Sequence, residues 1–85
     1  MSKDDRLKRM RYRAWHRGTK ESDFILGTFA DARLPSLDDE ALDAFEVLLD
    51  VADPVIYDWV IGRVPVPDDM NTPLMRELLA FKIKL

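Results

Sequence analysis

Signals that begin or end helices divide this chain into short segments. They stand at Gly18, Pro35, Asp53-Pro54 and Thr72-Pro73. Glycine adopts the left-handed backbone that ends many helices, whereas proline fits the first turn of a helix but breaks its interior. Between these positions apolar residues recur every three or four places, and no segment alternates apolar and polar residues for long enough to form a strand. The sequence therefore predicts an all-α protein, a compact bundle of five short helices that forms one domain over residues 1–85.

An amphipathic helix is predicted from Asp4 to His16, with arginines on one side and apolar residues on the other. Its apolar stripe consists of Leu7, Met10, Ala14 and Trp15. Gly18 follows as the residue that ends this helix, and Thr19 is the predicted cap of a second helix over residues 20–32.

The second helix has the broadest apolar surface and is predicted to be the most buried element. Pro35 closes it, and Ser36 is the expected cap of a third helix with an acidic first turn. The predicted core contains Phe24, Phe29, Phe45 and Leu48. We expect core or half-buried positions for Trp15, Tyr57 and Trp59.

Two further helices are predicted to begin at a capping residue that precedes a proline. Asp53 caps the fourth helix, with Pro54 in its first turn, and Gly62 ends it. The stretch RVPVPDDMN (63–71) is predicted to be a loop, because prolines at alternate positions forbid a helix. The pair Thr72-Pro73 then begins the last helix.

Charge is unevenly distributed along the chain. Residues 1–20 carry eight basic and two acidic side chains, so the overall net charge of −3 conceals a basic N-terminal segment. Such a segment either meets an acidic partner or forms the solvated side of a helix that the protein's own acidic residues complement. The sequence leaves both interpretations open.

Little of the chemistry that catalysis requires is present. The chain has no cysteine, its one histidine (His16) has no nucleophile placed beside it, and its three glycines are too scattered for a phosphate-binding loop. The acids Asp38, Asp39 and Glu40 fall in the first turn of a helix, which explains them without a metal. We therefore expect a binding protein and not an enzyme, with no catalytic residue, no metal site and no tightly bound cofactor.

No stretch of the sequence indicates insertion into a membrane. The longest run without a charged residue, FILGTFA, has seven residues. A helix needs roughly 18–20 apolar residues to cross a bilayer. The N-terminus also lacks the apolar stretch of a signal peptide, so a soluble protein is expected.

Three segments, in this order, resemble the succinate dehydrogenase assembly factor family. They are RGTKESD (17–23), which contains the pattern R-G-x-x-E, SLDDEALDAFEVLLD (36–50) and DPVIYDW (53–59). The first pattern is weak alone, but the ordered set within a resemblance over residues 6–81 is much more specific. The resemblance implies a small five-helix protein that assists the attachment of FAD to the flavoprotein subunit of succinate dehydrogenase.

Partners and site residues are also implied by this resemblance. Family members bind the flavoprotein subunit of succinate dehydrogenase, and in bacteria also that of fumarate reductase, and favour the covalent bond between the FAD 8α-methyl and a histidine of that client. FAD then belongs to the client and not to this chain. The partner-binding residues implied by the match are Arg17, Gly18, Glu21, Asp23, Arg11 and Arg13. We expect a monomer in the bacterial cytoplasm, with the mitochondrial matrix less favoured.

Two alternatives stay open from the residues alone. Residues 17–21 also suit a plain helix boundary, in which Gly18 ends one helix and Arg17 forms an exposed ion pair with Glu21. The six basic side chains from Arg6 to Arg17 also suit a small helical nucleic-acid-binding protein that uses its arginine-rich first helix. The net negative charge of the chain argues against a nucleic-acid partner.

Overall fold

The computed structural model describes residues 2–81, and over this part of the chain it is helical with no strand. Its elements are α1 (Lys3–Trp15), α2 (Lys20–Arg33), the 3-10 turn η1 (Leu34–Ser36), α3 (Asp39–Leu49), α4 (Asp53–Val60), the 3-10 turn η2 (Asp68–Met70) and α5 (Pro73–Ala80). The predicted all-α class with five short helices is confirmed. None of the helices within residues 2–81 is long and apolar enough to cross a membrane.

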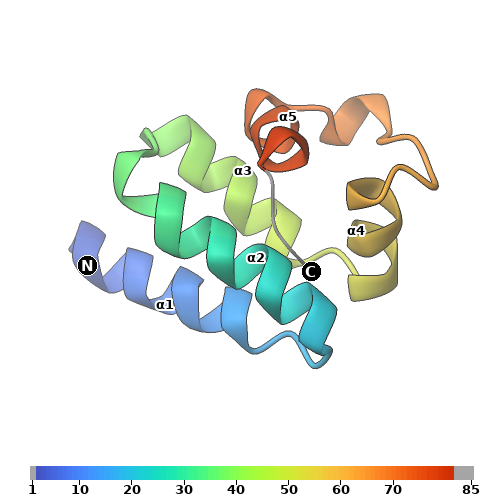
Figure 1. Ribbon diagram of the computed structural model, residues 1–85. Helices are drawn as coiled ribbons and strands as arrows, with labels where there is room; N and C mark the ends of the chain where they lie inside the picture. Colours follow the sequence, from blue (N-terminus) through green and yellow to red (C-terminus); the bar gives the residue numbers. More distant parts are fainter. Residues whose placement is uncertain (1, 82–85) are drawn as a thin grey trace.

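Each helix packs against at least one helix that is not its neighbour in the sequence (Figure 1). α1 and α2 lie side by side and run in opposite directions, and α3 packs against α1 and α5. α4 contacts both α2 and α5. The radius of gyration is 12.0 Å, close to the value of about 12 Å expected for a compact chain of this length.

All five helices contribute buried side chains to one core, and its phenylalanine residues come from α2, α3 and the end of α5. The rings of Phe29 and Phe45 stand 5.9 Å apart, and Phe81 meets Phe29 edge-on at 5.4 Å. Phe29, Phe45 and Leu48 are buried, as predicted, and so is Trp59. Tyr57 is half-buried, whereas Trp15 is 36% exposed.

The prediction that Phe24 belongs to the core is wrong, because its side chain is 39% exposed. The side chain of Ser22, two positions earlier, is buried instead. Two positions along a helix correspond to a rotation of about 200°, so Phe24 and Ser22 lie on opposite sides of α2. The core side of α2 is therefore the one that contains Ser22, Ile25 and Phe29.

Local capping chemistry forms as predicted at two helix starts. The Thr19 hydroxyl accepts a hydrogen bond from the Ser22 N–H, and the Thr72 hydroxyl accepts one from the Met75 N–H. Gly18 and Gly62 have positive φ values of 111° and 80°, which agrees with their predicted positions after helix ends. These signals set the boundaries of α1, α2, α4 and α5.

Two other predicted caps are wrong. The cap of α3 is Asp38, whose carboxylate accepts from the Ala41 N–H, because Ser36 lies in η1 and donates its hydroxyl to the Arg33 carbonyl. The cap position of α4 is Ala52, and Asp53 lies inside the first turn without a capping hydrogen bond. The Asp53 carboxylate has a different partner, described below.

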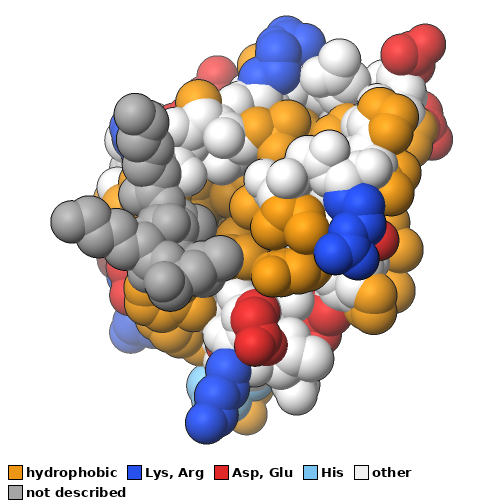
Figure 2. All heavy atoms as spheres, turned by 45° about the vertical axis from the view of Figure 1, so that its right-hand side comes forward, with side chains coloured by type: hydrophobic (Ala, Val, Ile, Leu, Met, Phe, Trp, Pro, Cys, Tyr) orange, Lys and Arg blue, Asp and Glu red, His pale blue; other side chains and the backbone are white. Residues whose placement is uncertain are grey.

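Apolar side chains are also exposed on the face formed by α4, α5 and their connection (Figure 2). They include Val55, Ile61, Val64 and Leu79. Figure 2 shows these apolar areas separated by polar and charged groups, and single exposed apolar side chains are common on protein surfaces.

Candidate functional site

The RGTKE segment forms the turn between α1 and α2 and the first residues of α2. α1 ends at Trp15, and Gly18 then reverses the chain with its positive φ before Thr19 caps α2. Gly18 is exposed, and a β-carbon built at this position would meet no other atom within 4 Å. The backbone at Gly18 is therefore open to close approach by another chain.

Arg17 points inward from this turn. Its Nε donates to Asp53 Oδ1 at 2.7 Å, and its two terminal nitrogens donate to the carbonyl oxygens of Leu49 and Val51. The side chains of Arg17 and Asp53 are only 9% and 15% exposed. Arg17 therefore joins the α1–α2 turn to the connection between α3 and α4. The alternative in which Arg17 pairs with Glu21 is wrong, because Asp53 is its carboxylate partner.

Asp23 also has an internal partner. Its carboxylate accepts a hydrogen bond from the backbone N–H of Arg17 at 2.5 Å. Asp23 lies in the first turn of α2, where a negative charge is favoured by the helix dipole. Two sets of contacts thus hold the turn. The Arg17 side chain binds the α3–α4 connection and the start of α4, and the Asp23 carboxylate binds the Arg17 backbone N–H.

Glu21 is exposed at the second position of α2, and within residues 2–81 its carboxylate has no ion-pair or hydrogen-bond partner. It borders a groove of about 270 Å³ between the N-terminal ends of α2 and α4. The groove is also lined by Thr19, Ser22, Asp53, Pro54 and Tyr57. Glu21 is therefore the acidic residue of RGTKE whose charge is available to a partner, and Lys20 beside it is exposed as well.

The basic side of α1 is complemented by acids of α3. Arg6 contacts Asp43 at 2.6 Å and also Glu46, and these hydrogen bonds raise the pKa of Arg6 above its ordinary value. Arg13 pairs with Asp50 at 2.6 Å. For these arginines the structure favours the interpretation in which the protein's own acidic residues complement the helix.

Arg11 and Arg13, the remaining predicted site residues, lie on α1 and not on the RGTKE turn. Arg11 is half-buried. Arg13 lines a hollow with Tyr12, His16 and Arg17, next to the α3–α4 connection. The structure thus brings Arg13 and Arg17 to one hollow, whereas Glu21 faces the separate groove beside α4.

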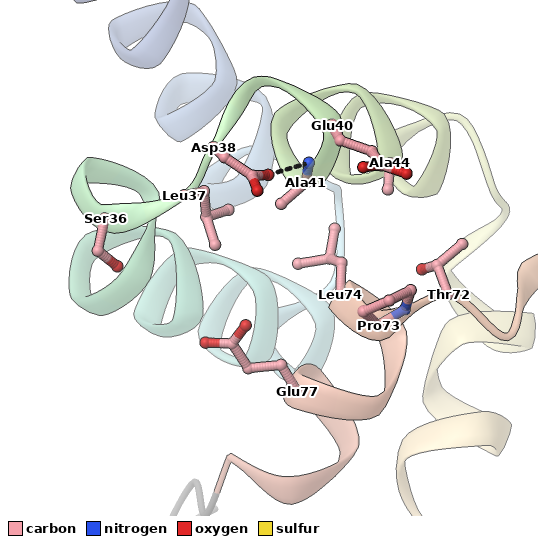
Figure 3. A pocket seen from close by; sticks show the side chains of 10 residues that line it. All are labelled: Ser36, Leu37, Asp38, Glu40, Ala41, Ala44, Thr72, Pro73, Leu74 and Glu77. Carbon is pink, nitrogen blue, oxygen red and sulfur yellow. Dashed lines mark hydrogen bonds between the residues drawn. The ribbon is translucent and has the colours of Figure 1, made fainter.

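A second hollow of about 360 Å³ lies between α3 and α5 (Figure 3). Figure 3 shows the Asp38 carboxylate turned toward the Ala41 N–H, which it caps, over a floor that includes Leu74. Glu77 at its edge is 3.6 Å from Arg33. Two of the acids around this hollow are therefore engaged within the fold, and the RGTKE surface is the stronger candidate for a functional site.

Asp53 is the site residue that the sequence analysis did not identify. The Asp-Pro dipeptide predicted a helix cap, which is a local role. The actual partner, Arg17, is 36 positions away along the chain. The only signal in the sequence was the presence of both residues in segments that share the family resemblance, 17–23 and 53–59.

Comparison with known proteins supports the same family. A sequence model of the family described as "Flavinator of succinate dehydrogenase" matches residues 8–82. The "FAD assembly factor SdhE" of Acetobacter pasteurianus is 38% identical over 74 residues, which cover 87% of this chain and 68% of that protein. The protein of the same name from Coxiella burnetii is 37% identical over 71 residues, covering 84% of this chain and 85% of the relative.

Mitochondrial proteins are also similar but longer. The "Succinate dehydrogenase assembly factor 2, mitochondrial" of Dictyostelium discoideum is 30% identical over 69 residues, which cover 81% of this chain. The matched part spans 49% of the Dictyostelium protein and 28% of its namesake from Mycosarcoma maydis. With a family match over most of its length and relatives at this identity, the chain belongs to the family described as the flavinator of succinate dehydrogenase.

Proposed function

We propose that this protein is an assembly factor that binds the flavoprotein subunit of succinate dehydrogenase and promotes its covalent flavinylation with FAD. Family membership and the names of the bacterial and mitochondrial relatives support a role in succinate dehydrogenase assembly. The flavoprotein subunit of fumarate reductase is a second proposed client. We further propose a monomer that acts in the bacterial cytoplasm, in keeping with the bacterial relatives.

The proposed docking surface is centred on Gly18 and Glu21. Gly18 offers an open backbone, and Glu21 offers an exposed carboxylate without a partner in the described part of the chain. A cationic side chain or an N–H donor on the client suits such a carboxylate. Arg17 and Asp23 hold the turn in shape, and Arg11 and Arg13 extend the surface along α1.

In this proposal the client carries out the chemistry. The factor holds the FAD-binding domain and the mobile capping domain of the client so that the client's histidine stands against the isoalloxazine ring. Fixed proximity and orientation of reacting groups lower a barrier without any catalytic residue from the factor. The FAD stays with the client throughout, and the factor holds no cofactor tightly.

The observation that carries the proposal is the open glycine beside a solvent-facing glutamate, on a turn that buried contacts hold in place. Glu21→Ala tests it in a cell that lacks its own factor. Covalent flavin survives a denaturing gel, so the ultraviolet fluorescence of the client subunit reports the function directly. We expect a variant that folds normally but leaves the client without covalent flavin.

Glu40→Ala is the matched control, because Glu40 is also an exposed glutamate at the second position of a helix, α3. It should support flavinylation as the parent does. If client fluorescence stays normal with both Glu21→Ala and Arg17→Ala, RGTKE is only a turn between two helices and the proposed docking site is wrong.

A further inference from the structure

Within residues 2–81, the least exposed ion pair joins the α1–α2 turn to the start of α4 at the candidate site. Arg17 lies in the α1–α2 turn and Asp53 begins α4, and their side chains meet at 2.7 Å with little exposure to water. A buried charge that loses its partner is strongly unfavourable, so neither side chain is free to turn outward to a client without cost.

The guanidinium also completes the end of α3. The carbonyl oxygens of the last turn of a helix have no partner within the helix. Arg17 donates to one of these, Leu49, and to the carbonyl of Val51 just beyond it. The C-terminal end of α3, the N-terminal end of α4 and the α1–α2 turn are therefore fixed to one another by one side chain.

This contact sets the shape of the groove beside Glu21. One wall comes from the start of α2, with Thr19 and Glu21, and the other comes from α4, with Pro54 and Tyr57. Asp53, the first residue of α4, lines the same groove. The position of Glu21 relative to Pro54 and Tyr57 thus depends on the pairing of Asp53 with Arg17.

We propose that Asp53 is a positioning residue for the docking surface: acting through Arg17, it fixes α4 against the RGTKE turn so that Gly18, Glu21 and Tyr57 form one surface for the flavoprotein subunit. The inference rests on the proposed function, since it concerns the same client. Asp53 touches no client atom in this scheme. Tyr57 and Pro54 join the docking surface as contact residues of α4.

A double-mutant cycle separates positioning from direct contact. Arg17→Gln, Asp53→Asn and the double variant are compared with the parent for affinity toward the purified flavoprotein subunit, at a temperature where circular dichroism shows each to be folded. If the surface shifts when the internal pair is lost, the contact of Glu21 with the client is lost with it, and loss of one such charge-assisted contact weakens binding by about tenfold. If both residues act through one contact, the double variant binds the client as tightly as the single variant with the lower affinity. The inference is overturned if the losses of binding free energy in the two single variants add up in the double variant. It is also overturned if Asp53→Asn binds as tightly as the parent.

A kinetic readout distinguishes a shifted surface from a defective fold. Initial flavinylation rates are measured at increasing concentrations of the full-length factor. Asp53→Asn should raise the half-saturating concentration by about tenfold while the rate at saturation stays that of the parent. Asp43→Asn is the matched control, because Asp43 also pairs with an arginine, Arg6, but is 73% exposed. Its half-saturating concentration should equal that of the parent. An increase as large as that of Asp53→Asn would contradict a specific role for Asp53.

Arg17→Lys keeps the test decisive if Asp53→Asn does not fold. Lysine retains the positive charge beside Asp53. It lacks the planar guanidinium group, whose terminal nitrogens also donate to two carbonyl oxygens. Because the pair with Asp53 can persist, we expect Arg17→Lys to keep a half-saturating concentration closer to that of the parent than Arg17→Gln does. Equal losses of binding in the two variants would overturn the inference.

Glu21→Ala in the same assay separates this inference from the proposed function. If Glu21→Ala loses binding and Asp53→Asn does not, only the positioning role is wrong. If the parent itself does not bind the flavoprotein subunit, the proposed function fails and the positioning role fails with it.

Discussion

The indole ring of Trp15 lies directly against Gly27, so a β-carbon added at position 27 would overlap it. This contact brings the end of α1 close to the middle of α2. The Trp15 Nε1 also donates to Asp31 on the next turn of α2, at 3.3 Å. A glycine inside a helix is normally unfavourable, and here its lack of a side chain makes room for an aromatic ring.

Gly27→Ala should therefore destabilise the protein, even though alanine favours helices more than glycine does. Displacing the ring costs roughly 1–3 kcal/mol, which outweighs the gain in helix propensity of about 1 kcal/mol or less. Urea denaturation followed by circular dichroism measures the difference. In a Trp15→Ala background the same change should cost nothing or stabilise, and a loss that persists there would show that the indole is not the cause.

Phe29→Ala should reduce the free energy of unfolding by roughly 3–5 kcal/mol, because Phe29 is fully buried between Phe45 and Phe81. Phe24→Ala is the control on the same helix, and its cost should be several-fold smaller because Phe24 is largely exposed. Chemical denaturation of the two variants decides the point. Equal losses would mean that the inward side of α2 has been assigned wrongly.

Gly18→Ala and Gly62→Ala should lose similar amounts of stability, about 1–2 kcal/mol, because both glycines have positive φ. A β-carbon at either position meets no neighbouring atom, so the cost is backbone strain and not a clash. Only Gly18→Ala should reduce client flavinylation, since Gly18 lies on the proposed docking surface. Equal flavinylation by the two variants would remove Gly18 from that surface.

Arg6→Gln should lower the melting temperature by an amount that does not change with pH around neutrality. The raised pKa of Arg6 means that its contribution is fully present below its ordinary pKa and is lost only as the pH rises through the raised value, in strong alkali. Added salt should shrink the difference, because the Debye length falls to about 3 Å at roughly 1 M. Thermal melts of both proteins at two pH values and two salt concentrations measure both effects. A difference that grows with salt would contradict the ion-pair explanation.

Interactions between close neighbours in the sequence were predictable, and those between distant residues were not. Thr19 and Thr72 cap helices through N–H groups three residues away, so their roles follow from local sequence. Asp53 suits a cap equally well by local criteria, yet its carboxylate pairs with a residue of another element. Its role depends on how the helices pack, which no local pattern contains.

The same limit applies to the core and to the candidate site. Hydrophobicity alone favoured Phe24, but the buried side of α2 is set by the helices that pack against it, α1 and α4 among them, and Ser22 occupies the inward position. At RGTKE, the helix boundary and the exposed Gly18 could be predicted from the glycine and the threonine that follow. The burial of Arg17 could not, because its acceptors come from the α3–α4 connection.

The contact between Arg17 and Asp53 also has a consequence for protein synthesis. RGTKE leaves the ribosome before the start of α4, because Asp53 follows Arg17 by 36 residues. Until α4 has emerged and folded back, the Arg17 guanidinium lacks its carboxylate partner, whereas the contact with Asp23 is already available to hold the turn. The groove beside Glu21, which Asp53, Pro54 and Tyr57 help to line, is therefore complete only after the start of α4 has been synthesised.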